Sequence, residues 1–228
     1  SYVDKCLQEK NIPVPGEKSL VSMRDIQRDY CDFIEKYLMD LCQPGQCILY
    51  LWQNQNTVVI GRNQNPWAEC RTTLLEDEGG HLARRLSGGG AVYHDMGNLN
   101  YTIIADGQGE LNFGRFCGIV LDALARLGVK GELNGRNDMT IDGRKFSGNA
   151  QYAKQGRVMH HGTILFDSDS SVLAGALQVD EEKIKAKGVK SVRSRVTNVR
   201  PCLSKDMTLD EFRETLSNSL ISGDFQRY

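Results

Sequence analysis

A run of three glycines between two arginines and a β-rich segment is the first feature of this sequence that could bind a ligand. The run is Gly88–Gly90, which follows Arg84 and Arg85 and precedes Ala91–Asp95. Consecutive glycines allow several backbone N–H groups to surround an anion, and an arginine guanidinium pairs with phosphate or carboxylate as a planar fork. The run matches neither G-x-G-x-x-G nor G-x-x-x-x-G-K-[ST]. By itself it is therefore compatible with an anion-binding loop or with a flexible hairpin loop.

A second candidate site surrounds a predicted turn at Asp142-Gly143. Before the turn, Asn137 and Asp138 could orient Mg²⁺ or a nucleotide, because Mg²⁺ takes few protein oxygens together with several waters or phosphates. After the turn, Lys145 supplies a point charge that could contact a carboxylate or phosphate oxygen in a cleft. A solvent-exposed lysine on a hairpin is the alternative that these residues leave open.

Two histidines and a basic segment complete the candidates. His160 and His161 enter a predicted strand, so their side chains face opposite ways and at most one can serve a given site. No third ligand has the spacing of a zinc site, which favours a packed or hydrogen-bonded histidine over metal binding. The basic segment, residues 185–198, predicts either a solvated face or a loop that binds phosphate or an acidic partner.

The composition argues against several classes of partner. The chain has 228 residues with 28 Lys+Arg and 29 Asp+Glu, so no global positive field favours nucleic acid, and we expect no nucleic-acid partner. Apolar stretches stay well short of the roughly 18 residues that span a bilayer, so we expect no membrane partner. Charged side chains are spread through the first twenty residues, so we expect no secretory signal. Seven scattered cysteines without a C-x-x-C pair predict reduced thiols in a cytoplasmic protein.

The apolar periodicity predicts four helices around these residues. They cover residues 23–41, 112–128 and 180–186, and a final stretch that begins at Thr208. Thr208 and Glu211 form a capping box for the final helix. Its apolar stripe consists of Leu209, Phe212, Leu216 and Leu220.

Short β-rich runs separate the helices. Strands are predicted at residues 47–52 and 57–60, which we expect to form one hairpin, at 138–141 and after the turn that follows, and at 162–166. This mixture lacks strict β-α alternation, so we predict an α+β fold with mixed or antiparallel sheets and flanking helices. The length predicts one domain over residues 22–228, preceded by an N-terminal arm at residues 1–21 whose role is open.

Together these segments resemble the signature of the lipoate–protein ligase family. The resemblance extends from Tyr37 to Asn198 and rests on five motifs: Arg84–Asn100, Gly135–Asp138, Arg144–Gly148, His160–Thr163 and Lys187–Asn198. It implies a mixed-sheet catalytic domain shared with biotin ligases. It also implies an enzyme that uses ATP and Mg²⁺ to convert lipoic or octanoic acid to the acyl-adenylate. The acyl group would then pass to a lysine on lipoyl domains of 2-oxoacid dehydrogenases or on the glycine-cleavage H protein.

The same resemblance implies a role for each matching residue. Lys145 would be the catalytic residue, in contact with both the acyl carbonyl oxygen and the α-phosphate. The nucleotide would be bound by Arg85, Gly90, Ala91, Val92, Tyr93, Asn137 and Asp138, with Asp138 also the candidate Mg²⁺ ligand. The lipoyl channel would be bordered by Ser87, Gly88, Gly89 and His94, and residues 187–198 would close over the adenylate.

The sequence departs from the family pattern in two places. The family's first helix opens with an Asn-Leu-Ala motif, whereas the matching stretch here is Cys31–Glu35. Many bacterial members also carry a C-terminal accessory domain, whereas this sequence ends at Tyr228, one predicted helix after the signature. We expect that domain to be absent, truncated or supplied by another chain. In that case the chain would be an acyl-transferase half that depends on a separate accessory domain for adenylation.

Three other interpretations compete with a lipoate–protein ligase. An octanoyltransferase of the same fold would place a nucleophilic cysteine where this chain has Val158, or within Arg136–Asp138, and Cys117 lies on no motif. A noncatalytic protein that binds lipoyl domains has no need of Lys145 and Arg85. A biotin ligase would show a different glycine-rich signature. The prediction is therefore a lipoate–protein ligase, with the preference between lipoate and octanoate left open.

Overall fold

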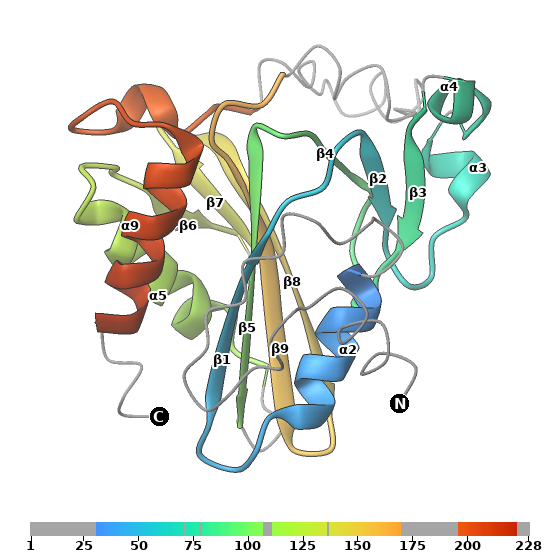
Figure 1. Cartoon of the computed structure of the whole chain (residues 1–228), viewed down its shortest axis with the longest axis horizontal. Helices are drawn as coiled ribbons and strands as arrows, with labels where there is room; N and C mark the ends of the chain where they lie inside the picture. Colours follow the sequence, from blue (N-terminus) through green and yellow to red (C-terminus); the bar gives the residue numbers. More distant parts are fainter. Residues whose placement is uncertain are drawn as a thin grey trace, which may run out of the picture.

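Two β-sheets and the helices that flank them make up the described part of the chain (Figure 1). The computed structural model describes residues 31–70, 72–77, 79–106, 111–135, 137–169 and 196–222. The predicted arm at residues 1–21 and the predicted helix at residues 180–186 lie outside the described residues. None of the described helices is both long and apolar enough to cross a bilayer.

The larger sheet is antiparallel throughout and has the strand order β1-β5-β9-β8-β7-β6. Two-residue turns with positive φ, Asp142-Gly143 and Gln155-Gly156, join β7 to β8 and β8 to β9. Such turns match the right-handed twist of the strands they connect, and the hairpin predicted at Asp142-Gly143 is confirmed. The strands are β1 (Cys47–Trp52), β5 (Asn98–Asp106), β6 (Glu132–Asn134), β7 (Asp138–Ile141), β8 (Arg144–Lys154) and β9 (Arg157–Leu165).

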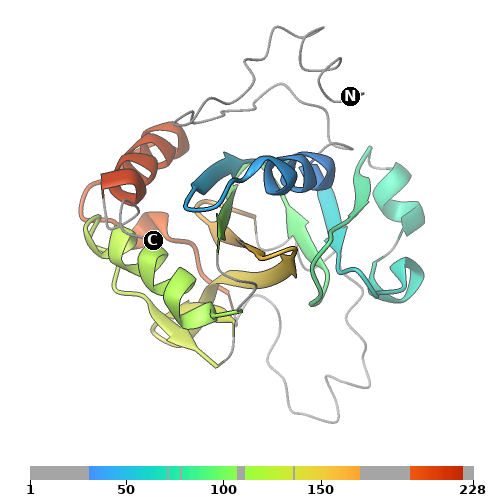
Figure 2. The ribbon, with the colours of Figure 1, turned by 90° about the horizontal axis from the view of Figure 1, so that it is seen from below.

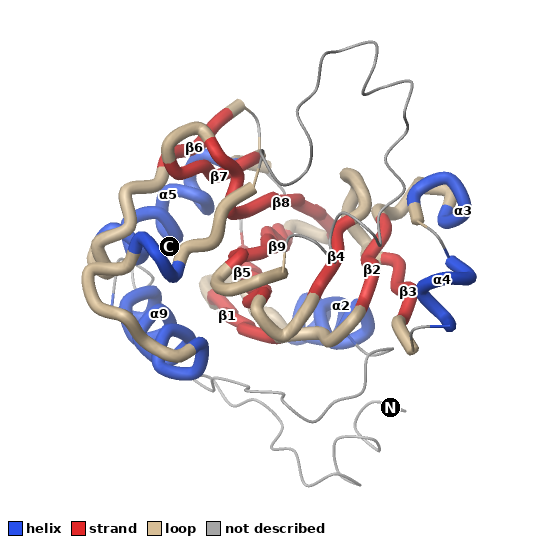
Figure 3. Tube along the Cα trace, turned by 90° about the horizontal axis from the view of Figure 1, so that it is seen from above, coloured by secondary structure: helices blue, strands red, loops and turns tan. Residues whose placement is uncertain are grey.

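The smaller sheet has the order β3-β2-β4 and lies beside the larger one (Figure 3). Its strands are β2 (Thr57–Ile60), which is central, β3 (His81–Arg84), which is parallel to β2, and β4 (Val92–His94), which is antiparallel to it. The short helices α3 (Pro66–Glu69) and α4 (Thr72–Asp77) lie on the side of β3.

The predicted hairpin of residues 47–52 with 57–60 is wrong, although both segments are strands. β1 pairs with β5 in the larger sheet, whereas β2 pairs with β3 and β4 in the smaller one. The four residues between them carry the chain from one sheet to the other. Strand pairing over a long sequence separation leaves no mark on local composition, whereas nearness along the chain favours the wrong partner here.

Helices cover both faces of the larger sheet (Figure 2). Helices α5 (Phe113–Ala125) and α9 (Leu209–Ser222) pack on one face, and α2 (Cys31–Leu41) packs on the other. The predicted capping box of α9 is confirmed, because the Thr208 N–H donates to Glu211 Oε2 at 2.7 Å and the Glu211 N–H donates to Thr208 Oγ1 at 3.3 Å. Arg200–Cys202 forms a short 3₁₀ helix, η2, before α9.

The central strand β5 separates an apolar core from a polar wall. Leu99, Tyr101 and Ile103 face α5 and α9 and belong to the main core. Because side chains alternate along a strand, Asn100 and Thr102 point to the other face, where they are equally buried. Buried polar side chains of this kind require hydrogen-bond partners, so the face toward α2 and the smaller sheet is where a polar site can form.

Helix α9 packs on the core through Phe212, Leu216 and Leu220, and Phe212 adds an aromatic contact. Phe212 is fully buried, and its ring lies 4.7 Å from the ring of Phe166, measured between centroids. We expect Phe212→Ala to lower the free energy of unfolding by about 3–5 kcal/mol, because it leaves a cavity in the core. Urea unfolding would measure the loss. Glu214→Ala, an exposed change on the same helix, is the matched control, and an equal loss in both variants would contradict the assignment.

Candidate active site

A cavity lies between the polar face of the larger sheet, the smaller sheet and helix α2. The smaller sheet supplies Val59, Val92 and His94, and α2 supplies Glu35. The larger sheet supplies the floor, from Trp52 on β1 and Asn100 on β5 to Thr163 on β9 and Gly148 on β8. The site is therefore assembled from both sheets and one helix.

Most of the residues that the sequence singled out meet in this cavity. The lining includes Arg85, Gly89, Gly90, Ala91, Val92, His94, Asn137 and Lys145. They come from segments around residues 85–94 and 137–145, which are far apart in the chain. The structure thus places the predicted glycine-rich loop and the predicted lysine on the same cavity.

Four predicted residues do not line the cavity. The side chain of Ser87 is buried, and Gly88 is exposed on the surface of the glycine-rich loop. Asp138 lies at the edge of the cavity, where it contacts Lys145. Tyr93 points the other way, because its neighbours on β4 face the cavity and side chains alternate along a strand. Its ring packs in the core of the smaller sheet, so only the backbone of Tyr93 is placed to contact a ligand in the cavity.

Arg85 supports the glycine-rich loop from within. Its Nη2 donates to the carbonyl oxygens of Gly88 at 2.9 Å and Gly90 at 2.7 Å, and its Nη1 donates to Val59 O at 3.1 Å. Gly89 has a φ of 99°, and a Cβ there would lie 2.8 Å from Arg85 Nη2. Glycine is required at position 89 because other residues rarely adopt this φ and because a side chain would collide with the Arg85 guanidinium.

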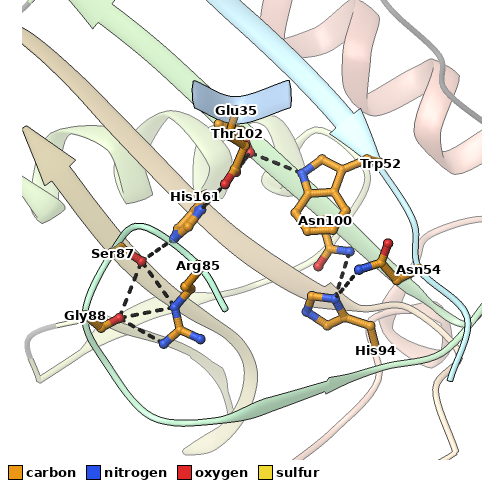
Figure 4. Close-up of polar contacts among 10 residues, drawn as sticks. All are labelled: Glu35, Trp52, Asn54, Arg85, Ser87, Gly88, His94, Asn100, Thr102 and His161. Atoms are coloured by element: carbon orange, nitrogen blue, oxygen red, sulfur yellow. Dashed lines mark hydrogen bonds and ion pairs between the residues drawn. The ribbon is translucent and has the colours of Figure 1, made fainter. Parts of the chain in front are cut away.

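A relay of buried hydrogen bonds joins this loop to helix α2 (Figure 4). His161 Nε2 lies 2.6 Å from Ser87 Oγ, and His161 Nδ1 lies 2.9 Å from a carboxylate oxygen of Glu35. Because a carboxylate only accepts, His161 Nδ1 carries a hydrogen and donates it to Glu35, while Nε2 shares a hydrogen bond with the serine hydroxyl. Arg85 Nε in turn donates to Ser87 Oγ at 3.2 Å.

The other end of the relay reaches β1. The Thr102 hydroxyl donates to the Glu35 carboxylate, and Trp52 Nε1 donates to Thr102 Oγ1 at 3.2 Å. Glu35 is only 1% exposed, so these partners supply the hydrogen bonds that water would otherwise provide. The relay resembles a serine–histidine–acid triad in its spacing. Ser87, however, is 1% exposed and accepts from Arg85, which disfavours it as a nucleophile.

The two adjacent histidines face opposite sides of the sheet, as their spacing predicts. His161 lines the cavity, whereas His160 is buried on the far side, where its ring stacks on Phe116 with 5.1 Å between centroids. Gln151 Nε2 lies 2.9 Å from His160 Nδ1. Burial, reinforced by the nearby His161, lowers the pKa of His160 to about 3.

His94 forms the wall of the cavity opposite Arg85 and Ser87. Its ring lies edge-on to Trp52, with 5.6 Å between centroids, and its Nδ1 is approached by the side-chain nitrogens of Asn54 and Asn100. Burial is the main cause that lowers the pKa of His94 to about 3, and the positive charge of Arg85 adds to it. The ring is therefore neutral at physiological pH.

Lys145 lies on the floor of the cavity and forms an ion pair with Asp138. Its Nζ lies 2.8 Å from Asp138 Oδ1, and both side chains are partly exposed. Gly148 makes this position possible, because a Cβ there would lie 2.8 Å from Lys145 Nζ. The backbone of Lys145 also accepts a hydrogen bond from the Thr197 N–H at 2.9 Å.

The basic segment predicted to close over the adenylate lies outside the described residues as far as residue 195. Its described end does contact the site. Val196 forms a parallel bridge with Lys145, and its carbonyl accepts from Arg144 Nη2 at 2.6 Å. The role predicted for residues 187–198 stays a prediction.

The described cysteines give no support to a thiol nucleophile or a zinc site. Cys42, Cys47, Cys70, Cys117 and Cys202 are free, and burial raises the pKa of Cys117 to about 12, which leaves it a neutral thiol. None of these five lines the cavity. Among the described residues there is no group of three His, Cys, Asp or Glu side chains that could hold a metal ion.

Sequence reasoning missed several residues of the site. Glu35, Trp52, Asn100, Asn149 and Thr163 line the cavity, although the sequence predicts no site role for them individually. One signal was present for Asn100, since asparagines at two alternate positions interrupt an apolar run at the start of β5. Glu35 offered no comparable signal, because a glutamate on an amphipathic helix is ordinarily solvated.

The two buried histidines make stability depend on pH. In the folded protein both histidines have a pKa of about 3, below the ordinary value of 6.5. Below pH 6.5 the unfolded state therefore binds more protons than the folded state, and the free energy of unfolding falls as the pH is lowered toward 3. Between pH 7 and pH 5 we expect a loss of about 2 kcal/mol per histidine, measured by urea unfolding. His160→Gln should show about half the decline of the unchanged protein, and an undiminished decline would contradict the assignment.

The chain was compared with known proteins. Residues 33–221 match the family model described as the lipoyl protein ligase A/B catalytic domain. Over 185 residues the chain is 49% identical to the lipoate-protein ligase LplJ of Bacillus subtilis (strain 168), an alignment that covers 80% of this chain and 56% of that protein. The chain therefore spans about half the length of this curated relative.

Two solved structures resemble the fold. One, with a TM-score of 0.73 and 29% identity, comes from the study of a bi-partite lipoate protein ligase and its E2 lipoyl domain from Thermoplasma acidophilum, and the match covers 84% of this chain and 78% of that one. The other is a lipoate-protein ligase A bound with ATP, with a TM-score of 0.69, 26% identity and coverage of 81% and 76%. The predicted α+β fold of this catalytic-domain type is confirmed.

Proposed function

The chain belongs to the family of lipoyl protein ligase A/B catalytic domains, and on that premise we propose that it joins lipoate to a lysine of a lipoyl domain through an acyl-adenylate. The observation that carries the proposal is the cavity in which Lys145 and the glycine-rich loop meet. A cation and a loop of available backbone N–H groups are what the joining of two anions requires.

In the first half-reaction, a carboxylate oxygen of lipoate attacks the α-phosphorus of ATP and pyrophosphate leaves. Lys145 lies on the cavity floor, where its ammonium group can contact both the carboxylate and the α-phosphate and offset the charge that accumulates between them. Arg85 acts mainly through the loop, because its guanidinium is bonded to loop carbonyls and so sets the direction of the loop N–H groups.

In the second half-reaction, the neutral amine of the target lysine attacks the acyl carbonyl carbon. An amide bond forms, AMP leaves with the electron pair of the anhydride bond, and the amine loses a proton. Lys145 would polarise the carbonyl oxygen, and the cavity would hold the adenylate in place for the incoming amine. An acceptor of this kind is named with the Thermoplasma acidophilum ligase, which is described together with its E2 lipoyl domain.

The residues beside Lys145 fit the limited demands of Mg²⁺. This ion is commonly held by one or two carboxylates together with substrate phosphates and waters, rather than by a full set of protein ligands. Asp138 is the carboxylate at the edge of the cavity, already paired with Lys145. When bound there with ATP, Mg²⁺ would neutralise phosphate charge, while Lys145 would remain directed to the reacting oxygens.

A transferase half is the second candidate function, and one observation favours it. The Thermoplasma acidophilum relative is described as a bi-partite lipoate protein ligase. The catalytic cavity would then receive an adenylate whose formation requires a separate accessory domain. The acceptor protein and a cytoplasmic location stay predictions.

One experiment separates the two candidates. An apo lipoyl domain is incubated with this chain and either lipoate, ATP and Mg²⁺ or preformed lipoyl-adenylate, and its intact mass is measured. Modification in both reactions indicates a complete ligase, whereas modification with the adenylate alone indicates a transferase half. If neither reaction modifies the domain beyond the rate without protein, the proposed function is wrong.

Replacement of Lys145 tests the proposed mechanism. We expect Lys145→Ala to reduce transfer from lipoyl-adenylate by at least a hundredfold, because the cation that offsets the developing charge is lost. The melting temperature should change little, since the side chain is partly exposed and its ion pair with Asp138 is a surface pair. Lys154→Ala, an exposed change on the same strand, is the control, and near-normal transfer by Lys145→Ala would exclude the role.

A further inference from the structure

His94 holds a polar atom for which the described residues offer no partner. Its side chain is only 3% exposed and lines the cavity, and its Nε2 is buried without a hydrogen bond to any described residue. Buried polar atoms are nearly always paired, so this atom on the cavity wall is placed to bond to a molecule that enters the cavity.

The neighbours of His94 determine that Nε2 is a hydrogen-bond donor. Asn54 Nδ2 and Asn100 Nδ2 lie 3.4 and 3.5 Å from Nδ1, which they leave as an acceptor. Asn98 maintains this orientation, because its Nδ2 donates to Asn100 Oδ1 at 2.8 Å and turns the Asn100 amide nitrogen toward the ring. The neutral ring then carries its hydrogen on Nε2. A ligand that satisfies it must bring an acceptor.

The sheet register places His94 at a definite distance from Lys145. Asn100 lies opposite Thr163 on β9, and the Thr163 hydroxyl accepts from the Gly148 N–H on β8 at 3.3 Å. Asn100 and Gly148 are thus two strand spacings apart, about 10 Å. Lys145 Nζ lies over Gly148, and the His94 ring lies against Asn100. This separation is comparable to the length of an extended octanoyl chain.

The geometry points to His94 as a specificity-determining residue that selects acyl groups with a hydrogen-bond acceptor at the end remote from the carboxylate. The inference rests on the proposed function, in which the carboxylate lies at Lys145. Lipoate carries the two sulfur atoms of its dithiolane ring at that remote end, whereas octanoate carries only methyl and methylene groups. The Nε2–H group of His94 donates to a dithiolane sulfur, and with octanoate it stays unpaired.

The size of the preference follows from the cost of an unpaired donor. A buried polar group without a partner is unfavourable, and a site built around one discriminates against analogues that lack the matching group. Sulfur is a weak acceptor, so the effect lies at the low end of the usual range. We expect a preference for lipoyl over octanoyl groups of about tenfold, of which His94 supplies a factor of about three to ten.

A competition assay measures this preference directly. Equal amounts of lipoyl-adenylate and octanoyl-adenylate are offered with an apo lipoyl domain, and the ratio of the two products by intact mass gives the ratio of kcat/KM values. His94→Phe keeps a planar ring but removes the donor, and we expect the ratio to fall three- to tenfold while octanoyl transfer persists. His94→Gln restores an N–H donor and should recover part of the preference. Met96→Ala, an exposed change two residues away, is the control.

The outcomes distinguish this inference from the proposed function. If the unchanged protein transfers neither group, the proposed function fails. If it transfers both and His94→Phe keeps the original ratio, the role of His94 is overturned. Calorimetric titration of the unchanged protein with lipoate and with octanoate gives a second measurement that needs no variant. Equal or tighter binding of octanoate would also overturn the inference.

Discussion

The buried carboxylate of Glu35 is the constraint around which the site is organised. A charged group that is 1% exposed is tolerated only with close partners, and here they are His161 on β9 and Thr102 on β5. Through His161 and Ser87, the same carboxylate is connected to the glycine-rich loop. Helix α2, the larger sheet and the loop are thereby held in one arrangement, and displacement of any one would leave a buried polar group unpaired.

The second constraint is the close approach of the glycine-rich loop to the end of strand β2 within the smaller sheet. The glycine-rich loop passes directly over the end of β2, where a Cβ at Gly61 would collide with the carbonyl of Gly89. Arg85 occupies the space beneath the loop and bonds to its carbonyl oxygens. The loop is therefore shaped before any ligand binds, and the cost of ordering it is met during folding rather than during binding.

The two ends of the cavity have different chemical character, which is what an acid with a long apolar chain requires. Lys145 and Asp138 place charge at one end, near the surface. Trp52, His94 and Asn100 form the other end, where all three side chains are buried. The charged end suits the proposed chemistry at a carboxylate, and the buried end suits the proposed recognition of an acyl group.

The sequence determined much of this by itself: the α+β class, helices α5 and α9, the capping box of α9, the turn before Lys145, and the two motifs that meet in the cavity. These follow from local rules, namely periodicity, capping and turn chemistry, which act within a few residues. Tertiary structure alone decided that β1 and β2 belong to different sheets, that Tyr93 faces away from the cavity, and that Glu35 and Asn100 belong to the site. Pairing between distant strands and burial of a polar side chain depend on contacts across the fold, which local sequence does not record.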